Sequence, residues 1–182
     1  AFKSPGLPSK DKLEAKVADD LERLYSMQNY DGGFPFWQRG YESWPYLTVH
    51  VVNALVRAKA KGFAIERGPL DNGLEYLRTI EQRYPYYYGE DIRRTITSYA
   101  LYTRMLAGDR DVARAKGLIK EAGGADKLSL EAVGWLLGVV AQQADAADER
   151  KAILRLLDNK VTETAAAANF TTATSDGAYL IL

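Results

Sequence analysis

The sequence predicts an all-α protein of about seven helices arranged in two layers. Apolar residues recur at spacings of three and four along most of the chain, which is the period of a helix with one buried face. Residues that start and stop helices flank these segments, and strand-like segments are almost absent before residue 170. Together these observations favour packed helices over a sheet.

The first two helices are predicted from their apolar stripes and from the residues that bound them. The first follows Pro8-Ser9 and ends near Gln28-Asn29, and the second begins after Pro45 and stops at Gly62. Each stripe lies on one helical face; the residues are Leu13, Val17, Leu21 and Leu24 in the first helix, and Leu47, Val51, Leu55 and Ala58 in the second.

The next three helices have equally clear boundaries. Gly68-Pro69 opens the third, because proline is tolerated in the first turn, where its missing N–H has no partner to lose. The fourth is predicted over residues 95–106 and is closed by Gly108. The fifth spans residues 112–122 and ends at Gly123-Gly124, since glycine readily closes a helix.

The last part of the chain is predicted to contain two more helices and a less regular tail. Ser129 is a suitable N-cap for a helix over residues 130–141, and a seventh helix is predicted over 147–157. The small residues of 162–168 suggest a linker or a helix end. Residues 170–174 and 179–182 flank a turn, which fits either a hairpin or a loop that leads into another helix.

Charge-rich and apolar helices alternate along the chain. The helices that begin near residues 12, 70, 111 and 148 are rich in Lys, Glu and Asp, whereas those near 47, 95 and 130 are more apolar all round. Such alternation predicts an apolar layer covered by a solvated one. An inner ring of helices inside an outer ring satisfies this pattern, and so does a superhelical stack of helix pairs.

The most specific motif is the segment Gln28-Asn29-Tyr30-Asp31-Gly32-Gly33-Phe34 between the first two helices. Its two glycines permit the positive φ angles of a tight turn, and Gln28 can bond exposed groups at a helix end. Phe34 and Trp37 can cover the joint. We therefore interpret this segment as a structural clamp between helices.

This Gln-x-x-Asp-Gly-Gly-Phe segment resembles the repeat at hairpin joints of α/α-toroids, a fold shared by terpenoid cyclases, protein prenyltransferase β-subunits and the thioester domains of complement and α2-macroglobulin proteins. The following segment, residues 43–52 (Ser-Trp-Pro-Tyr-Leu-Thr-Val-His-Val-Val), is similar to the Trp-Leu-Thr-Ala-Tyr-Val helix start of macroglobulin thioester domains. The resemblance covers roughly residues 20–182 and implies an incomplete α/α-toroid, similar to terpenoid cyclases, from a bacterial α2-macroglobulin.

The resemblance also defines what this chain lacks. In that family a Cys-x-Glu-Gln motif forms an internal thioester, and this sequence contains neither the motif nor any cysteine. His50, the single histidine, does not match the position of the histidine that assists the thioester in complement proteins. We therefore expect no catalytic residue and no cofactor in this chain.

Composition bears on the possible partners. Lys+Arg and Asp+Glu both number 24, so no net charge attracts nucleic acid or an anionic membrane. A chain without cysteine and with one histidine does not predict a metal site, and no apolar run approaches the length of a membrane span. The expected partners are instead the other domains of a parent chain and, through the parent, target proteases.

A tyrosine-rich segment is the candidate partner surface. Tyr86, Tyr87 and Tyr88 precede Glu90 and Asp91 in a stretch predicted as an inter-helix loop. Tyrosines bury large area in interfaces at little cost in conformational entropy. The alternative interpretation is a loop that packs on the end of the fold.

The resemblance implies a structural and target-engaging domain of a periplasmic protease inhibitor, and the apolar C-terminus suggests that residues 1–182 are a single domain excised from a larger protein. Two alternatives stay open. One is a glycan-acting α/α-barrel enzyme that uses the tyrosine-rich segment and acids such as Glu90 and Asp91, although adjacent acids do not define the carboxylate separation of a glycosidase. The other is a helical-repeat interaction module.

Overall fold

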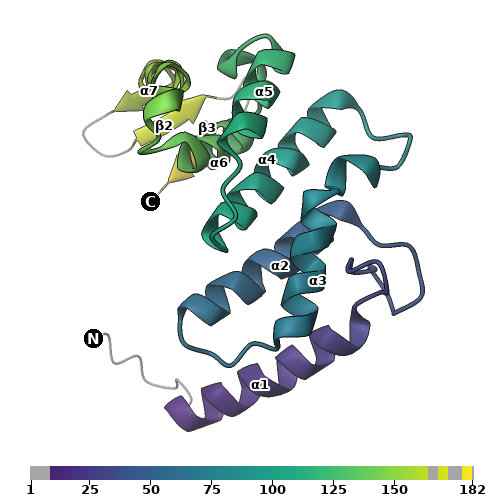
Figure 1. The fold of residues 1–182 in the computed structure, drawn as a ribbon. Helices are drawn as coiled ribbons and strands as arrows, with labels where there is room; N and C mark the ends of the chain where they lie inside the picture. Colours follow the sequence, from purple (N-terminus) through teal and green to yellow (C-terminus); the bar gives the residue numbers. More distant parts are fainter. Residues whose placement is uncertain (1–8, 164–167, 172–177, 182) are drawn as a thin grey trace. The chain divides into compact units, whose positions relative to one another are not determined.

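The computed structural model describes residues 9–163, 168–171 and 178–181, and within these ranges it contains seven α-helices (Figure 1). The predicted all-α class is therefore confirmed. The helices are α1 (Lys10–Met27), α2 (Pro45–Ala60), α3 (Arg67–Arg78), α4 (Glu90–Leu106), α5 (Val112–Ala122), α6 (Leu130–Val140) and α7 (Ala147–Lys160). Among the described residues, none of the helices has both the length and the apolar character of a membrane span.

The chain forms two compact units, Ala1–Leu77 and Arg78–Leu182. The first contains α1, α2 and nearly all of α3. The second contains a 3₁₀ turn, η1 (Ile80–Gln82), the helices α4 to α7, and two further 3₁₀ turns, η2 (Ala125–Lys127) and η3 (Ala144–Ala146). The prediction of one excised domain stays a prediction, and so does the toroidal arrangement of its helices.

In the first unit, α2 is the most buried helix and packs closely on α3. Val49, Val52 and Leu55 are fully buried along α2, whereas Leu21 is the buried residue of α1. An added Cβ at Gly73 of α3 would lie 2.6 Å from Cγ2 of Val52, so the small residue permits the approach of the two helices.

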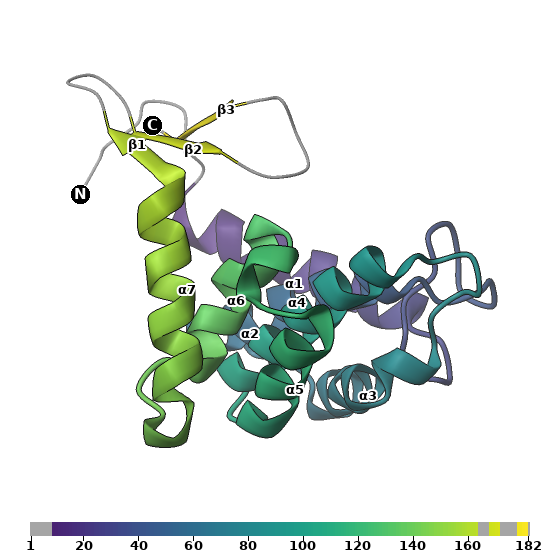
Figure 2. The ribbon, with the colours of Figure 1, turned by 90° about the horizontal axis from the view of Figure 1, so that it is seen from above.

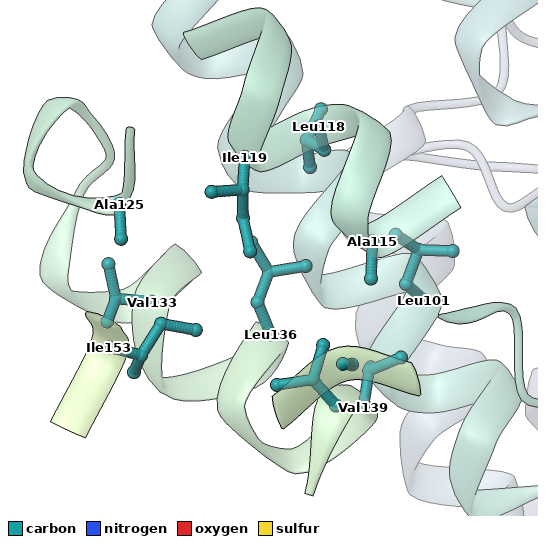
Figure 3. Close-up of a cluster of buried hydrophobic side chains, with 11 residues drawn as sticks. Leu101, Ala115, Leu118, Ile119, Ala125, Val133, Leu136, Val139 and Ile153 are labelled. Carbon is teal, nitrogen blue, oxygen red and sulfur yellow. The ribbon is translucent and has the colours of Figure 1, made fainter. Parts of the chain in front are cut away.

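In the second unit, the buried core surrounds α6. Helix α6 packs mainly against α4 and also against α5 and α7. Figure 3 shows the cluster, in which Leu136 of α6 lies among side chains of the neighbouring helices. Leu101 of α4, Ile119 of α5 and Ile153 of α7 all belong to it. The apolar α6 predicted from the sequence thus supplies the centre of this unit.

A three-stranded antiparallel sheet follows α7 directly (Figure 2). Its strands are β1 (Val161–Glu163), β2 (Ala168–Thr171) and β3 (Ala178–Ile181), in the order β1-β2-β3. Val161 pairs with Phe170, and Ala168 pairs with Ile181. The hairpin alternative for the tail is confirmed at β2 and β3, whereas the expected linker is wrong at residues 162–163, which form β1, and at residue 168. Residues 164–167, 172–177 and 182 lie outside the described ranges.

One helix boundary differs clearly from the prediction. Helix α4 begins at Glu90, five residues before the predicted start at Thr95. The first turn has no buried apolar residue to reveal it, since Ile92 is 51% exposed. Glu90 and Asp91 are therefore not loop residues. They occupy the first turn of a helix, where negative charge is favourable.

Candidate functional site

The candidate site is a polar pocket of about 210 Å³ within the second unit. Its walls come from η1, the tyrosine loop, α4 and α5. Three glutamates and three arginines contribute to it; the complete lining is Glu81, Tyr84, Glu90, Arg93, Arg94, Thr97, Arg114, Leu118 and Glu121. Of the residues predicted as a partner surface, Glu90 lines this pocket directly.

The tyrosine loop, which we define as residues 84–88, adjoins the pocket and is anchored to α4. The Arg93 guanidinium donates from Nε to the carbonyl oxygen of Tyr88 at 2.8 Å and from Nη2 to those of Pro85 and Tyr86, each at 3.4 Å. The Tyr84 hydroxyl lies 2.8 Å from Oγ1 of Thr97. One arginine thus holds three loop carbonyls, which fixes the loop against the helix.

Within the loop the tyrosine rings pack against one another and leave two of them facing solvent. Tyr86 and Tyr87 meet edge to face with ring centroids 5.5 Å apart, and Tyr87 meets Tyr88 in the same way at 5.3 Å. Tyr86 is 93% exposed and Tyr87 is 64% exposed. The structure therefore presents these two predicted residues to solvent, whereas Tyr88 is half-buried and stacks on Tyr84.

Arg114 of α5 bridges two carboxylates of the pocket lining, those of Glu81 and Glu121. Its Nε and Nη2 donate to the two oxygens of Glu81, each at 2.7 Å. Its Nη1 and Nη2 donate to the two oxygens of Glu121 at 2.7 and 3.0 Å. These bonds hold the pKa of the Glu121 carboxyl below its usual range and raise that of the Arg114 guanidinium.

The acid pair predicted from the sequence is held by a second arginine. Nη2 of Arg94 lies 2.8 Å from Oε2 of Glu90, and Nη1 lies 3.4 Å from Oδ1 of Asp91. The spacing of four and three residues places both acids beside Arg94 on the same helical face. Glu90 and Asp91 thus form part of an ionic network at the start of α4.

The predicted turn motif lies in the first unit and holds helix ends and loop backbone together. Nε2 of Gln28 donates to the carbonyl oxygens of Gly32 and Pro69, both at 2.9 Å, and so ties the end of α1 to the start of α3. Oδ1 of Asp31 accepts from the Gly33 N–H and from the Ser43 hydroxyl, each at 2.9 Å.

The two aromatic residues of this motif have different environments. Phe34 is 2% exposed, and its N–H donates to Oγ1 of Thr48 at 2.9 Å. Trp37 is 77% exposed and packs edge to face against Phe36, which is itself half exposed. Phe34 is thus buried at the joint between the helices, whereas most of the Trp37 side chain lies in solvent.

His50, the single histidine, is exposed on α2, and its imidazole stacks on Tyr46 with ring centroids 6.3 Å apart. Across the residues that the structure describes, no three His, Cys, Asp or Glu side chains form a group able to hold a metal ion.

Sequence reasoning did not find the arginines of the pocket. Arg93 and Arg94 lie next to the predicted acids, and their spacing from Glu90 was a usable signal for ion pairs on a helix. Arg114 gave no such signal, because its partner Glu81 is 33 residues away in the sequence.

The sequence is similar to a bacterial protein. It is 33% identical to alpha-2-macroglobulin of Escherichia coli strain K12 over 69 residues, which are 38% of this chain and 4% of that protein. No family model matches the chain.

Solved structures of the same class of protein match a much larger share of the chain. Native E. coli alpha-2-macroglobulin, in a structure from domain MG7 to the C-terminus, has a TM-score of 0.73 and 22% identity over 84% of this chain and 24% of its own. The trypsin-activated E. coli protein gives 0.72 and 22% over 83% of this chain and 11% of its own. Salmonella alpha-2-macroglobulin reacted with methylamine gives 0.73 and 19% over 90% of this chain and 11% of its own.

The structural matches and the sequence match support different conclusions. At such identities the structural matches establish the fold, and the sequence match independently points to the same class of protein. The chain spans only about a tenth to a quarter of the solved chains it matches. By both sequence and fold, the proteins that this chain resembles are the bacterial alpha-2-macroglobulins, as the turn motif and the segment 43–52 predicted.

Proposed function

We propose that this chain is the thioester-type helical domain, an α/α-toroid, of a bacterial alpha-2-macroglobulin-like protease inhibitor, in which it serves as a structural and target-engaging part. The observation that carries the proposal is the agreement between the two comparisons. A sequence match and structural matches over 82–90% of the chain lead to the same proteins.

The proposed mechanism is conformational. The E. coli relatives include forms activated by trypsin and by porcine elastase. By analogy, a protease would cleave the parent elsewhere, the domains would move, and the protease would be enclosed. Covalent capture requires a cysteine thioester, and these 182 residues contain no cysteine, so a thioester would need a residue supplied by another part of the parent.

The ionic pocket supports a role in binding over a role in catalysis. A glycosidase needs one carboxylic acid that is protonated at working pH, and its pKa is therefore raised. The Glu121 carboxyl instead has a lowered pKa because it accepts hydrogen bonds from Arg114. Glu90 and Asp91 are paired with Arg94. The lowered pKa of Glu121 and the ion pairs of Glu90 and Asp91 suit recognition of a ligand.

The parent is proposed to act in the periplasm, with its own further domains and its target proteases as partners. Fractionation of cells that express the tagged parent tests this localisation. Recovery with periplasmic markers is the expected result, and recovery with cytoplasmic markers contradicts it.

The functional test uses the full parent protein and trypsin. We expect the cleaved parent to retain trypsin that still hydrolyses a small peptide substrate but no longer digests casein, because enclosure excludes large substrates. If the retained trypsin still digests casein, the result contradicts the proposed trap. Glycan turnover that disappears in the Glu90→Gln variant would instead establish the enzyme alternative, and a superhelical shape in solution scattering would establish the repeat module.

A further inference from the structure

The surface around the pocket exposes its carboxylates more than its guanidinium groups. The side chains of Arg94 and Arg114 are 23% and 26% exposed, whereas those of Glu90, Asp91 and Glu121 are 74%, 90% and 56% exposed. The arginines lie beneath their acidic partners. The acidic rim, which we define as Glu90, Asp91 and Glu121, is therefore more exposed than the arginines that pair with it, even though the lining contains equal numbers of glutamates and arginines.

Around Arg114 the hydrogen-bonding capacity has the same bias. A guanidinium has five N–H donors, and an ionised carboxylate has about four acceptor positions. Arg114 makes four hydrogen bonds to Glu81 and Glu121, one to each carboxylate oxygen. Most of the donors of Arg114 are used, while each of these oxygens retains acceptor capacity. A ligand rich in N–H donors fits this balance better than an anion does.

The tyrosine loop adds an aromatic edge to the acidic rim. Tyr84 lines the pocket, and Arg93 lines it while bonding the backbone of the loop. Tyr86 and Tyr87 project into solvent from this fixed backbone. Aromatic faces attract cations, most often arginine, and an anchored loop loses little entropy when it binds.

We propose that this surface binds an arginine side chain presented by an extended segment of a partner protein, with the guanidinium on the acceptor positions that the carboxylates of Glu81, Glu90 and Glu121 retain and the segment lying along the tyrosine loop. Arginine fits better than lysine because its planar fork bonds carboxylates in a bidentate manner and stacks on aromatic rings. The proposal rests on this chain alone, so its failure leaves the proposed protease trap unaffected.

The test is an NMR titration of the 182-residue chain with the peptide acetyl-Gly-Gly-Arg-Gly-Gly-amide. A matched peptide carries citrulline, which has nearly the shape of arginine but no charge. We expect the arginine peptide to shift backbone signals of residues 81–94 and 114–121 and to bind at least about fivefold more tightly than the citrulline peptide. Equal binding of the two peptides, or shifts elsewhere in the chain, would overturn the proposal.

Two variants locate the interaction. The double change Glu90→Gln and Asp91→Asn removes rim charge, and we expect it to weaken arginine-peptide binding about fivefold. Its matched control is Asp126→Asn with Glu131→Gln, which removes the same charge from the first turns of η2 and α6 and leaves binding unchanged.

The second variant, Tyr86→Ala, alters a side chain that is 93% exposed, so loss of folding does not confuse the result. We expect it to weaken binding about threefold. The proposal fails if the double variant and Tyr86→Ala both bind as the unaltered chain does, or if the control pair weakens binding equally.

Discussion

Gly32 is the position in the turn motif where the backbone and its surroundings both require glycine. Its φ is +84°, a region that residues with a side chain rarely adopt. An added Cβ would also lie 2.2 Å from the carbonyl oxygen of Asn72 on α3. Gly40 has a similar φ of +97° but open space around it. Substitutions at these two glycines therefore distinguish the cost of backbone strain from the cost of steric overlap.

We expect Gly32→Ala to lower the free energy of unfolding by about 3 kcal/mol or more, because it combines backbone strain with a clash against main chain. Gly40→Ala is the matched control and should cost only the strain, about 1–2 kcal/mol. Urea unfolding followed by circular dichroism measures both. Equal losses in the two variants would show that Asn72 moves aside at little cost.

At the scale of secondary-structure elements, an ion-pair network follows the end of α4. Asp109 accepts from Nε and Nη2 of Arg104, at 3.1 and 3.2 Å, and from Nε of Arg78 at 2.8 Å. The hydrogen bonds from Arg104, and then those from Arg78, hold the pKa of the Asp109 carboxyl below its usual range. Asp109 thus links Arg104, in the last turn of α4, to Arg78, the first residue of the second unit.

The lowered pKa of Asp109 determines the sign of a pH effect. A carboxyl with a depressed pKa in the folded state stabilises the fold above its unfolded pKa, about 3.9, and this stabilisation is lost as pH falls through the folded value. We expect Asp109→Asn to cost about 1 kcal/mol at pH 7 and to lose less stability than the unaltered chain when pH falls below about 4. Urea unfolding between pH 2 and pH 7 tests this, with Asp126→Asn as the surface control. Parallel pH profiles for the unaltered chain and Asp109→Asn would contradict it.

Helix α6 shows how one element stabilises the second unit. Leu136 is fully buried at the centre of the cluster in Figure 3, whereas Leu154 on α7 is 45% exposed. We expect Leu136→Ala to lower the free energy of unfolding by about 2–5 kcal/mol through lost burial and a residual cavity. Leu154→Ala should cost less than about 1 kcal/mol. Thermal unfolding of the two variants compares them, and a similar cost at both sites would place the core elsewhere.

At the scale of the whole molecule, the balance of charge predicts its colloidal behaviour. Acidic and basic residues number 24 each, and the isoelectric point is about 6.9. Electrostatic repulsion between molecules is therefore weakest near neutral pH. We expect solubility to pass through a minimum close to pH 7 and to rise toward pH 9. Precipitation assays across this range measure it, and a flat profile would show that net charge does not limit solubility.

The sequence by itself determined the helical class, the order of the helices and the composition of the turn motif, because these depend on spacings of a few residues. It also supported the family resemblance that both comparisons confirm. The sequence did not predict the start of α4, because Glu90 and Asp91 stabilise that turn through Arg94 without an apolar stripe.

Tertiary structure alone decided which groups form the pocket. Arg114 meets Glu81 across 33 residues of sequence, and Gln28 reaches Pro69 across 41. Contacts at such separations depend on how the helices pack. One helical face carries several charged residues, and nothing in the local sequence distinguishes the one that will pair with a distant partner. The exposure of Trp37, which the motif did not predict, has the same origin: burial depends on which neighbours the fold brings to a side chain.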